Sequence, residues 1–202
     1  VMTVALLGAS IVSALFLPRA FLGLLILYLI LTTAYSFHLK RKVLIDVICL
    51  AGLYSLRILA GGAATFIEIS PWLMAFSLFF FLSLAFVKRY TELSAARDSQ
   101  EKVAGRGYWP SDIELIRVFG PTSGYLCVLV FCLYLNSPDV RAHYQRPEIL
   151  WLSCPILLYW ISYVWLIAYR EQLDDDPVVF ALKDRVSYAI GAIMLAILVA
   201  AI

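Results

Sequence analysis

Charged residues are scarce in this chain. Only 15% of its 202 residues are Asp, Glu, Lys or Arg, whereas 63% are hydrophobic, and the mean hydropathy is +0.88. Soluble domains average about 25% charged and about 45–50% apolar residues. The composition therefore excludes an ordinary soluble domain and predicts a polytopic membrane protein. The net charge of +2 is too small to indicate a protein that binds nucleic acid.

Histidine and cysteine are also rare, and their positions exclude a metal site built from them. The two histidines, His38 and His143, fall in polar segments on opposite sides of the predicted membrane. No Cys-x-x-Cys pair is present, so we expect the cysteines to be small apolar core residues, neither disulfides nor metal ligands. The four cysteines, all in apolar runs, are Cys49, Cys127, Cys132 and Cys154. A glycine-rich phosphate loop and a Gly-x-Ser-x-Gly motif are likewise absent from the sequence.

Apolar segments, in contrast, fill most of the chain. A membrane-spanning helix needs about 20 mostly apolar residues. Seven segments are candidates, at approximately 1–17, 20–37, 43–65, 71–87, 113–135, 149–169 and 186–202. The sequence thus predicts an all-α bundle of seven spans forming a single domain over residues 1–202. The first run lacks a basic segment and a cleavage site, so it does not indicate a signal peptide. Because the chain opens inside an apolar run and has an odd number of spans, we expect it to be a piece of a longer protein.

Lysine and arginine are distributed unequally between the two sets of alternate loops, which predicts the orientation. One set contains eleven of them and the other contains three, Arg19, Arg141 and Arg146. The basic set is expected to face the cytoplasm. Its members are Lys40, Arg41, Lys42, Lys88, Arg89, Arg97, Lys102, Arg106, Arg170, Lys183 and Arg185.

The cytoplasmic set also contains most of the acidic residues, so mixed charge gathers on one side of the membrane. Asp46 begins one predicted span, and Arg57 lies 11 residues later, on nearly the same helical face near mid-membrane. A guanidinium at that depth must face the bundle interior or a wet cavity. Two interpretations remain open: a cationic cavity for an anionic ligand, or an arginine satisfied for packing alone. Simple anchoring likewise remains an alternative for each charged loop.

The longest polar stretch, 86–114, supplies further cations and carboxylates to the same side. Lys88 and Glu92 are four residues apart and share a helical face, with Arg89 beside them. Carboxylates bind Mg²⁺ through oxygen, and Lys and Arg bind phosphate oxygens. A cytoplasmic mouth with both kinds of group suits a magnesium–diphosphate ligand, and its apolar walls suit a lipid tail.

Three blocks of sequence carry a resemblance to a known family. They are AYSFHLKRKVLIDVICLAGLYSLRILAGGAA (34–64), SPWLMAFSLFFFLSLAFVKRYTEL (70–93) and LDDDPVVFALKDR (173–185). Together they resemble the UbiA superfamily of intramembrane prenyltransferases, and most closely its branch of decaprenyl-phosphate phosphoribosyltransferases. The resemblance runs from about Leu22 to Tyr188 and implies nine transmembrane helices around a cavity that opens to the cytoplasm. The seven spans here would be the third to the ninth.

The resemblance implies roles for individual residues. Tyr35, Lys40, Arg57, Lys88 and Arg89 are candidate phosphate ligands, and Asp46 and Glu92 are candidate ligands of Mg²⁺, the implied cofactor. Asp98, Arg106 and Tyr108 match the family more loosely. The acidic run Asp174, Asp175 and Asp176 also resembles a family feature, although a solvated turn is the default interpretation.

Two departures from the family pattern affect these assignments. The Asp-rich metal motif N-D-x-x-D-x-x-x-D, which follows the second family helix, is absent from the chain. In aromatic prenyltransferases D-x-x-x-D follows the sixth helix, whereas this chain has Lys88-Arg89-Tyr90-Thr91-Glu92 there. Replacement of carboxylates by cations favours a substrate that carries more phosphate charge, such as phosphoribosyl pyrophosphate.

The reaction implied by this branch transfers a phosphoribosyl group to a polyprenyl phosphate. The lipid phosphate attacks C1 of the ribose, and pyrophosphate leaves with magnesium. One alternative is prenyl transfer from a prenyl diphosphate to an aromatic acceptor. The other is a non-catalytic membrane protein that binds lipid phosphate. The expected location is the bacterial inner membrane, with membrane lipids and no nucleic acid as partners.

Overall fold

The computed structural model describes residues 17–96, 103, 105–173 and 176–202. Within these residues every regular element is helical. The long helices are α2 (Arg19–Phe37), α3 (Ile45–Thr65), α4 (Pro71–Ala95), α5 (Ile113–Leu135), α7 (Ser153–Tyr169) and α9 (Arg185–Ala201). The short helices are η1 (Leu39–Arg41), η2 (Pro110–Asp112), α6 (Pro138–His143), η3 (Pro147–Leu152) and α8 (Pro177–Ala181).

The helices agree with the predicted bundle of spans. Five helical segments are long and apolar enough to cross a membrane: Arg19–Phe37, Ile45–Thr65, Pro71–Ala95, Pro110–Leu135 and Pro147–Tyr169. The apolar helix α9 is shorter, with 17 residues. These six elements correspond to six of the predicted spans, and the all-α prediction is confirmed. The remaining span, at 1–17, falls almost wholly outside the described residues.

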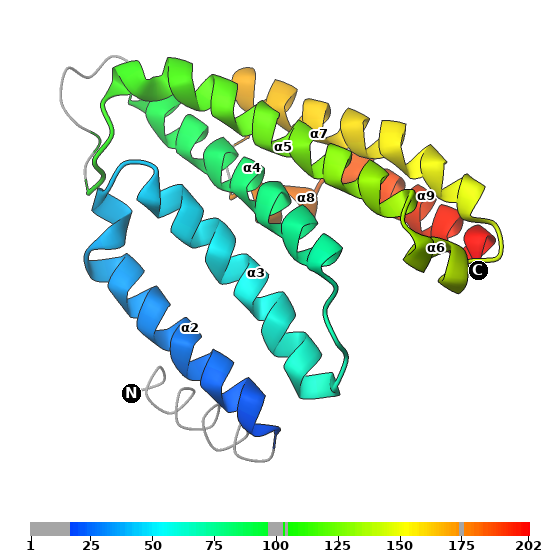
Figure 1. The fold of residues 1–202 in the computed structure, drawn as a ribbon. Helices are drawn as coiled ribbons and strands as arrows, with labels where there is room; N and C mark the ends of the chain where they lie inside the picture. The colour runs from blue at the N-terminus through cyan, green and yellow to red at the C-terminus, as the bar shows by residue number, and fades with distance from the viewer. Residues whose placement is uncertain (1–16, 97–102, 104, 174–175) are drawn as a thin grey trace.

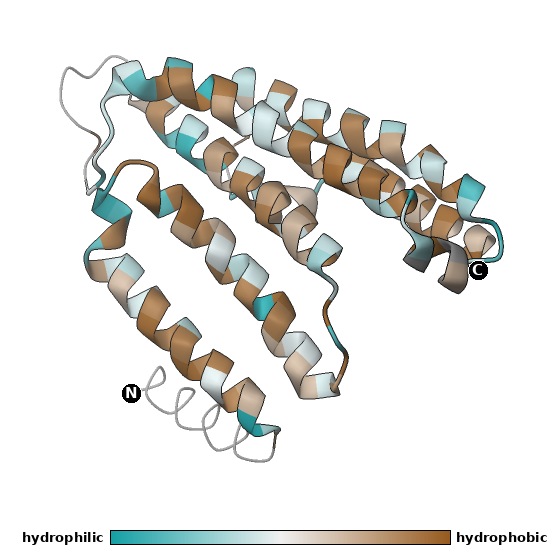
Figure 2. Cartoon of the chain, viewed as in Figure 1, coloured by the Kyte–Doolittle hydropathy of each residue, from teal (hydrophilic) through white to brown (hydrophobic). Residues whose placement is uncertain are grey.

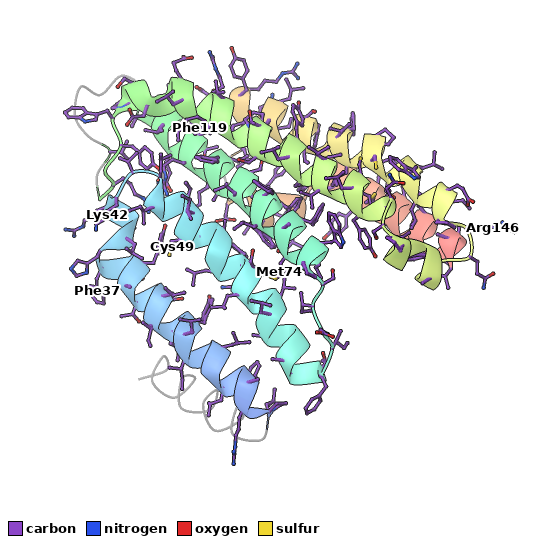
Figure 3. All side chains as sticks on the ribbon, in the orientation of Figure 1. Phe37, Lys42, Cys49, Met74, Phe119 and Arg146 are labelled. Carbon is purple, nitrogen blue, oxygen red and sulfur yellow. The ribbon has the colours of Figure 1, made fainter. Side chains whose placement is uncertain are left out.

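Neighbouring helices pack antiparallel, so their ends alternate between two sides of the molecule. α2, α3, α4 and α5 follow one another in space, and α7 lies along α5 (Figure 1). Figure 2 shows apolar residues over most of the helix surfaces, and hydrophilic residues at the turn between α2 and α3 and at the start of α5. Lys42 lies at that turn, while Arg146 lies at the far end of the molecule near the C-terminus (Figure 3). The two predicted sets of loops therefore lie at opposite ends of the bundle.

Local signals explain where several of these helices begin. Ser70 precedes α4, and its hydroxyl oxygen accepts a hydrogen bond from the Leu73 amide at 3.2 Å, with Pro71 at the first helical position. Asp184 caps α9 in the same way, since its carboxylate accepts from the Ser187 amide at 2.7 Å. These caps satisfy amides that the first turn of a helix leaves without a partner.

The core lies where α4, α5 and α7 meet. Ser83 of α4 is buried there, and its hydroxyl donates to the Gly120 carbonyl of α5 at 2.8 Å. The same oxygen accepts from the indole nitrogen of Trp165 on α7 at 3.1 Å. This hydroxyl therefore joins three helices, and the Gly120 carbonyl and the Trp165 indole nitrogen each have a partner in it. By contrast, α2 has no buried residue, as expected for an apolar helix whose faces meet lipid or further protein.

Candidate functional site

Polar side chains from four segments meet at the end of the bundle that contains Lys42. The segments are the end of α2, the start of α3, the last turns of α4 and the residues just before α5. Because α2 and α4 run toward this end and α3 and α5 start from it, chain order alone brings them together (Figure 1). We call the six joined side chains the arginine network; they are Tyr35, Asp46, Arg89, Glu92, Arg106 and Tyr108.

Asp46 is the fixed acidic member of the arginine network. It lies in the first turn of α3 and is completely buried. The Tyr108 hydroxyl donates to its Oδ1 at 2.7 Å and accepts a hydrogen bond from the Leu44 amide at 2.8 Å. That hydroxyl therefore ties the segment before α5 to the start of α3. Burial and the hydrogen bond to Asp46 raise the pKa of Tyr108, so the phenol stays a neutral donor.

Arg89 places a full positive charge inside the protein. It is completely buried in the last turns of α4, and its Nη2 lies 2.7 Å from Oδ2 of Asp46. Its Nη1 contacts the Glu92 carboxylate one turn further along α4. The guanidinium carbon also lies 5.4 Å from the centre of the Tyr108 ring. Two carboxylates and an aromatic face therefore compensate in part for the water that this cation loses on burial, while its Nε has no hydrogen-bond partner among the described residues.

Arg106 extends the arginine network to α2. Its Nε lies 3.3 Å from Oε2 of Glu92, and its Nη1 donates to the Tyr35 hydroxyl at 3.0 Å. Burial opposes the charged form of Arg106, but the Tyr35 hydrogen bond and the Glu92 charge outweigh that effect and raise its pKa. The residues before α5 are thereby connected to both neighbouring helices.

Lys88 belongs to a separate contact one residue away from Arg89. Its Nζ lies 2.5 Å from Oδ2 of Asp176, and both side chains are partly exposed. The other oxygen of Asp176 caps α8 by accepting from the Val178 amide at 3.0 Å. The default expectation of a solvated acidic turn was therefore wrong for Asp176, because Lys88 draws it against α4. Asp174 and Asp175 lie outside the described residues, as does Asp98.

Two further predicted residues lie outside the arginine network. Arg57 projects toward α2, where its Nε donates to the Tyr28 hydroxyl at 3.2 Å, and its guanidinium lies between the rings of Tyr28 and Tyr54. Lys40, in η1, is partly buried and has no hydrogen-bond or ion-pair partner among the residues that the structure describes. The proposed phosphate-binding roles of both residues stay predictions.

Two hollows flank the last turns of α4. One is lined by Leu50, Tyr54, Lys88 and Asp176, with Leu84, Ala85, Pro177 and Val178, and is small, with a volume of about 30 Å³, close to that of one water molecule. The other lies at the ends of α4 and α7, where Thr91, Glu92, Ser94 and Glu171 supply its polar lining. Lys88 and Glu92 thus open onto different hollows, although they are only one turn apart, and neither lining includes Lys40 or Arg57.

The described residues do not fit a magnesium site. Oδ1 of Asp46 accepts from Tyr108 and from the Val47 amide, and Oδ2 faces Arg89. Both oxygens of Glu92 contact Arg106. Over the described part of the chain, no three His, Cys, Asp or Glu side chains are grouped to hold a metal ion. Asp46 and Glu92 serve here as partners of arginine, so this geometry lends no support to their predicted role as metal ligands.

The contacts of three residues in this region were not predicted from the sequence. Arg106 and Tyr108 stand in an irregular segment, where no helical period indicates which side chains turn inward. Asp176 is 88 residues from Lys88 along the chain. The only available signal was the set Asp-Pro at 176–177, which is typical of a helix cap and start.

The family follows from comparison of the whole sequence with known families. The profile described as the UbiA prenyltransferase family matches residues 1–200. The chain belongs to the UbiA prenyltransferase family. Membership agrees with the helical bundle and with charged loops that converge at one end of it.

Individual relatives from this family differ in how much their names say. An uncharacterized protein, y4nM of Sinorhizobium fredii, is 38% identical over 94% of this chain and 37% of its own length. The nodulation protein NoeC of Azorhizobium caulinodans is 32% identical over 78% of this chain and 52% of its own length. The decaprenyl-phosphate phosphoribosyltransferase of Mycolicibacterium smegmatis is 24% identical over 88% of this chain and 57% of its own length. The chain thus spans between about a third and somewhat more than half of the relatives it matches.

Proposed function

We propose that this chain is part of an integral membrane transferase that moves a phosphoribosyl group from phosphoribosyl pyrophosphate to a polyprenyl phosphate. One observation carries the proposal: both candidate carboxylates at the charged end of the bundle are already neutralised by arginine. Asp46 contacts Arg89, and Glu92 contacts Arg89 and Arg106. The named activity of the Mycolicibacterium smegmatis relative supports the same choice.

The balance of charge at this end favours a ligand rich in phosphate. The negative and positive charges of the arginine network balance each other, and the charge of Lys88 balances that of Asp176. Beside them, η1 and the residue after it contribute Lys40, Arg41 and Lys42, which have no carboxylate partner among the described residues. A donor with a diphosphate and a further phosphate gains more from these cations than a prenyl diphosphate does.

The acceptor is expected to bind with its phosphate at the same end and its tail among the apolar helices. The hollow beside Lys88 has an ion pair at one side and mostly apolar walls from α3, α4 and α8. This combination of groups suits the junction of a phosphate head and a prenyl chain, but the hollow has a volume of only about 30 Å³ and has to widen when the acceptor binds. Lys88 has to release Asp176 before it can contact a phosphate of the donor or of the lipid.

The proposed step is a substitution at the anomeric carbon. A phosphate oxygen of the lipid forms a bond to C1 of the ribose, and the bond from C1 to the pyrophosphate oxygen breaks. The leaving pyrophosphate takes the bonding electrons, and nearby cations from η1 stabilise the charge that it gains. A phosphate nucleophile is already ionised near pH 7, so the step needs no general base.

Magnesium stays in the proposal only as the ion that accompanies a diphosphate donor. The described carboxylates do not form its site, so no step is assigned to them through the metal. Its importance has to be measured directly, by carrying out the assay with and without Mg²⁺.

The test uses membranes that contain the full-length protein of which this chain is a part. They are incubated with phosphoribosyl pyrophosphate labelled in the ribose and with polyprenyl phosphate, and the lipid fraction is analysed for label. We expect a labelled phosphoribosyl lipid in the presence of Mg²⁺. No labelled lipid under any condition, while another family transferase in the same membranes is active, would refute the phosphoribosyl proposal.

A parallel arm addresses prenyl transfer, which the family description favours. The same membranes receive a labelled prenyl diphosphate and a panel of phenolic acceptors. A prenylated phenol without a phosphoribosyl lipid would assign the aromatic reaction. Binding of polyprenyl phosphate with no product in either arm would indicate the non-catalytic alternative.

A further inference from the structure

The thiols of Cys132 and Cys154 meet between two helices. Cys132 lies on α5 and Cys154 on α7, and their sulfur atoms are 3.3 Å apart. Cys154 is buried and Cys132 is partly buried, and all four cysteines of the chain are free. The cysteines are free, as expected from the sequence, but the sequence did not indicate that two of them touch. The contact does not depend on the proposed function.

The register of the two helices independently explains why these thiols face each other. Gly120 of α5 packs against Trp165 of α7, and Gly124 packs against Ile161. In each pair the two residue numbers add to the same value, as they must along two antiparallel helices. Slightly more than two turns beyond Gly124, the same register brings position 132 opposite positions 153 and 154. The thiol contact is therefore a consequence of the whole α5–α7 interface.

The thiols lie at the end of the bundle away from the arginine network. Cys132 is three residues before the end of α5, and Cys154 is the second residue of α7. The loop between them carries Arg141 and Arg146, and the bias of lysine and arginine predicts that this side faces away from the cytoplasm. Disulfides persist in the oxidising compartments outside the bacterial cytoplasm.

We propose that Cys132 and Cys154 form a reversible disulfide that links α5 to α7. The disulfide would lie near the membrane surface that faces away from the cytoplasm. The oxidant is a small or protein-borne disulfide. The thiolate of one cysteine attacks this disulfide, forms a mixed disulfide with one half of the oxidant and releases the other half as a thiol. The thiolate of the second cysteine then attacks the protein sulfur of the mixed disulfide and releases the remaining half of the oxidant as a thiol. Two protein thiols thus lose two protons and two electrons in total, and the incoming disulfide gains them.

The motion needed for this reaction is small. A disulfide bond is about 2.05 Å long, so the sulfur atoms have to approach by little more than 1 Å. The register of α5 and α7 already places the two residues opposite each other, so no change of register is needed. Cys127, on the same helix as Cys132, is buried, and no thiol partner of Cys127 is present among the described residues. It therefore serves as a matched control.

The experiment uses the full-length protein in membranes treated with diamide, a membrane-permeant azo compound that takes two hydrogens from two thiols. Remaining thiols are blocked with N-ethylmaleimide, and peptides are analysed by mass spectrometry with and without dithiothreitol. We expect a reducible cross-link between Cys132 and Cys154 in the unchanged protein and in C49S and C127S. It should be lost in C132S and in C154S.

A stability measurement accompanies the peptide analysis. The oxidised protein in detergent should unfold about 5 °C above the reduced protein, because a cross-link restricts the unfolded chain. C127S should show the same difference, and C154S should show none. Retention of both thiols after exhaustive treatment of the unchanged protein, or a cross-link that instead includes Cys49 or Cys127, would overturn the proposal.

Discussion

Arg89 and Asp46 are both fully buried, so neither charge is stabilised by water. An ion that is removed from water pays several kcal/mol of desolvation, and only its partners compensate for that cost. The three groups that face Arg89 come from different segments: Asp46 from α3, Glu92 from α4 and Tyr108 from the residues before α5. At the scale of single residues, stability therefore depends on keeping this pair intact.

Asp46→Asn should strongly destabilise the protein. The change removes one charge of the pair and leaves the guanidinium of Arg89 buried, a loss of about 3–5 kcal/mol in the free energy of unfolding. Thermal unfolding in detergent measures the effect. Glu114→Gln is the matched control, because Glu114 pairs with Arg117 on the surface. Its loss should cost less than about 1 kcal/mol. Equal losses for the two variants would contradict the role given to Asp46.

Tyr108→Phe should cost about 1–3 kcal/mol, because it removes one hydroxyl and keeps the ring. The Leu44 amide loses its acceptor, and Oδ1 of Asp46 loses a donor at 2.7 Å. Thermal unfolding is again the measurement, and Tyr125→Phe is the control, since Tyr125 is exposed and its hydroxyl has no partner except Ser162 among the described residues. A Tyr108→Phe protein as stable as the Tyr125→Phe control would show that the bridge contributes nothing.

At the scale of helices, α5 approaches α7 closely because glycine stands at the contact points. A methyl group built on Gly120 would lie 1.9 Å from the Trp165 ring, and one on Gly124 would lie 2.5 Å from Ile161. Trp165 is itself held by its hydrogen bond to Ser83. The contact between these helices therefore has no room for a larger residue at position 120.

Gly120→Ala should separate α5 from α7 and lower the unfolding temperature, despite the better helix propensity of alanine. Gly52→Ala, within α3, is the control, because nothing lies within 4 Å of a methyl group there. That change should leave stability unchanged or raise it by up to about 1 kcal/mol. The same disulfide analysis then gives a second readout, since Gly120→Ala should also slow cross-linking of Cys132 to Cys154. Faster or unchanged cross-linking would argue against the proposed register.

The helices could be predicted from the sequence because long apolar runs leave few alternatives, and polar or proline-containing segments mark their ends. The side-chain contacts at the charged end could not be predicted in the same way. Lys88, Arg89 and Glu92 stand within two turns, yet Lys88 turns to Asp176 while Arg89 and Glu92 turn to each other. Which neighbour a long charged side chain reaches depends on the packing of α3, α4 and α8, and hydrophobic period carries no information about that choice.

At the scale of the whole molecule, basic residues that are candidates for donor binding and basic residues that are not lie at opposite ends of the bundle. Lys40 and Lys88 lie at the end that contains the arginine network, and Arg19 begins α2 at the opposite end. A phosphate-rich donor that binds at the charged end should therefore respond to changes there and not at Arg19. This separation makes it possible to compare variants that lose the same charge.

Lys40→Ala and Lys88→Ala should each weaken binding of phosphoribosyl pyrophosphate by about tenfold or more, since a charge-assisted phosphate contact contributes about 1.5–3 kcal/mol. Both side chains are partly exposed, so both variants should remain folded in detergent. Arg19→Ala removes the same charge from the opposite end and should leave affinity unchanged. Arg57→Ala tests the remaining candidate, whose guanidinium lies between two tyrosines. Isothermal titration of the full-length protein with the donor measures the affinity of all four variants. Wild-type affinity in both lysine variants would show that the donor does not bind at this end of the bundle.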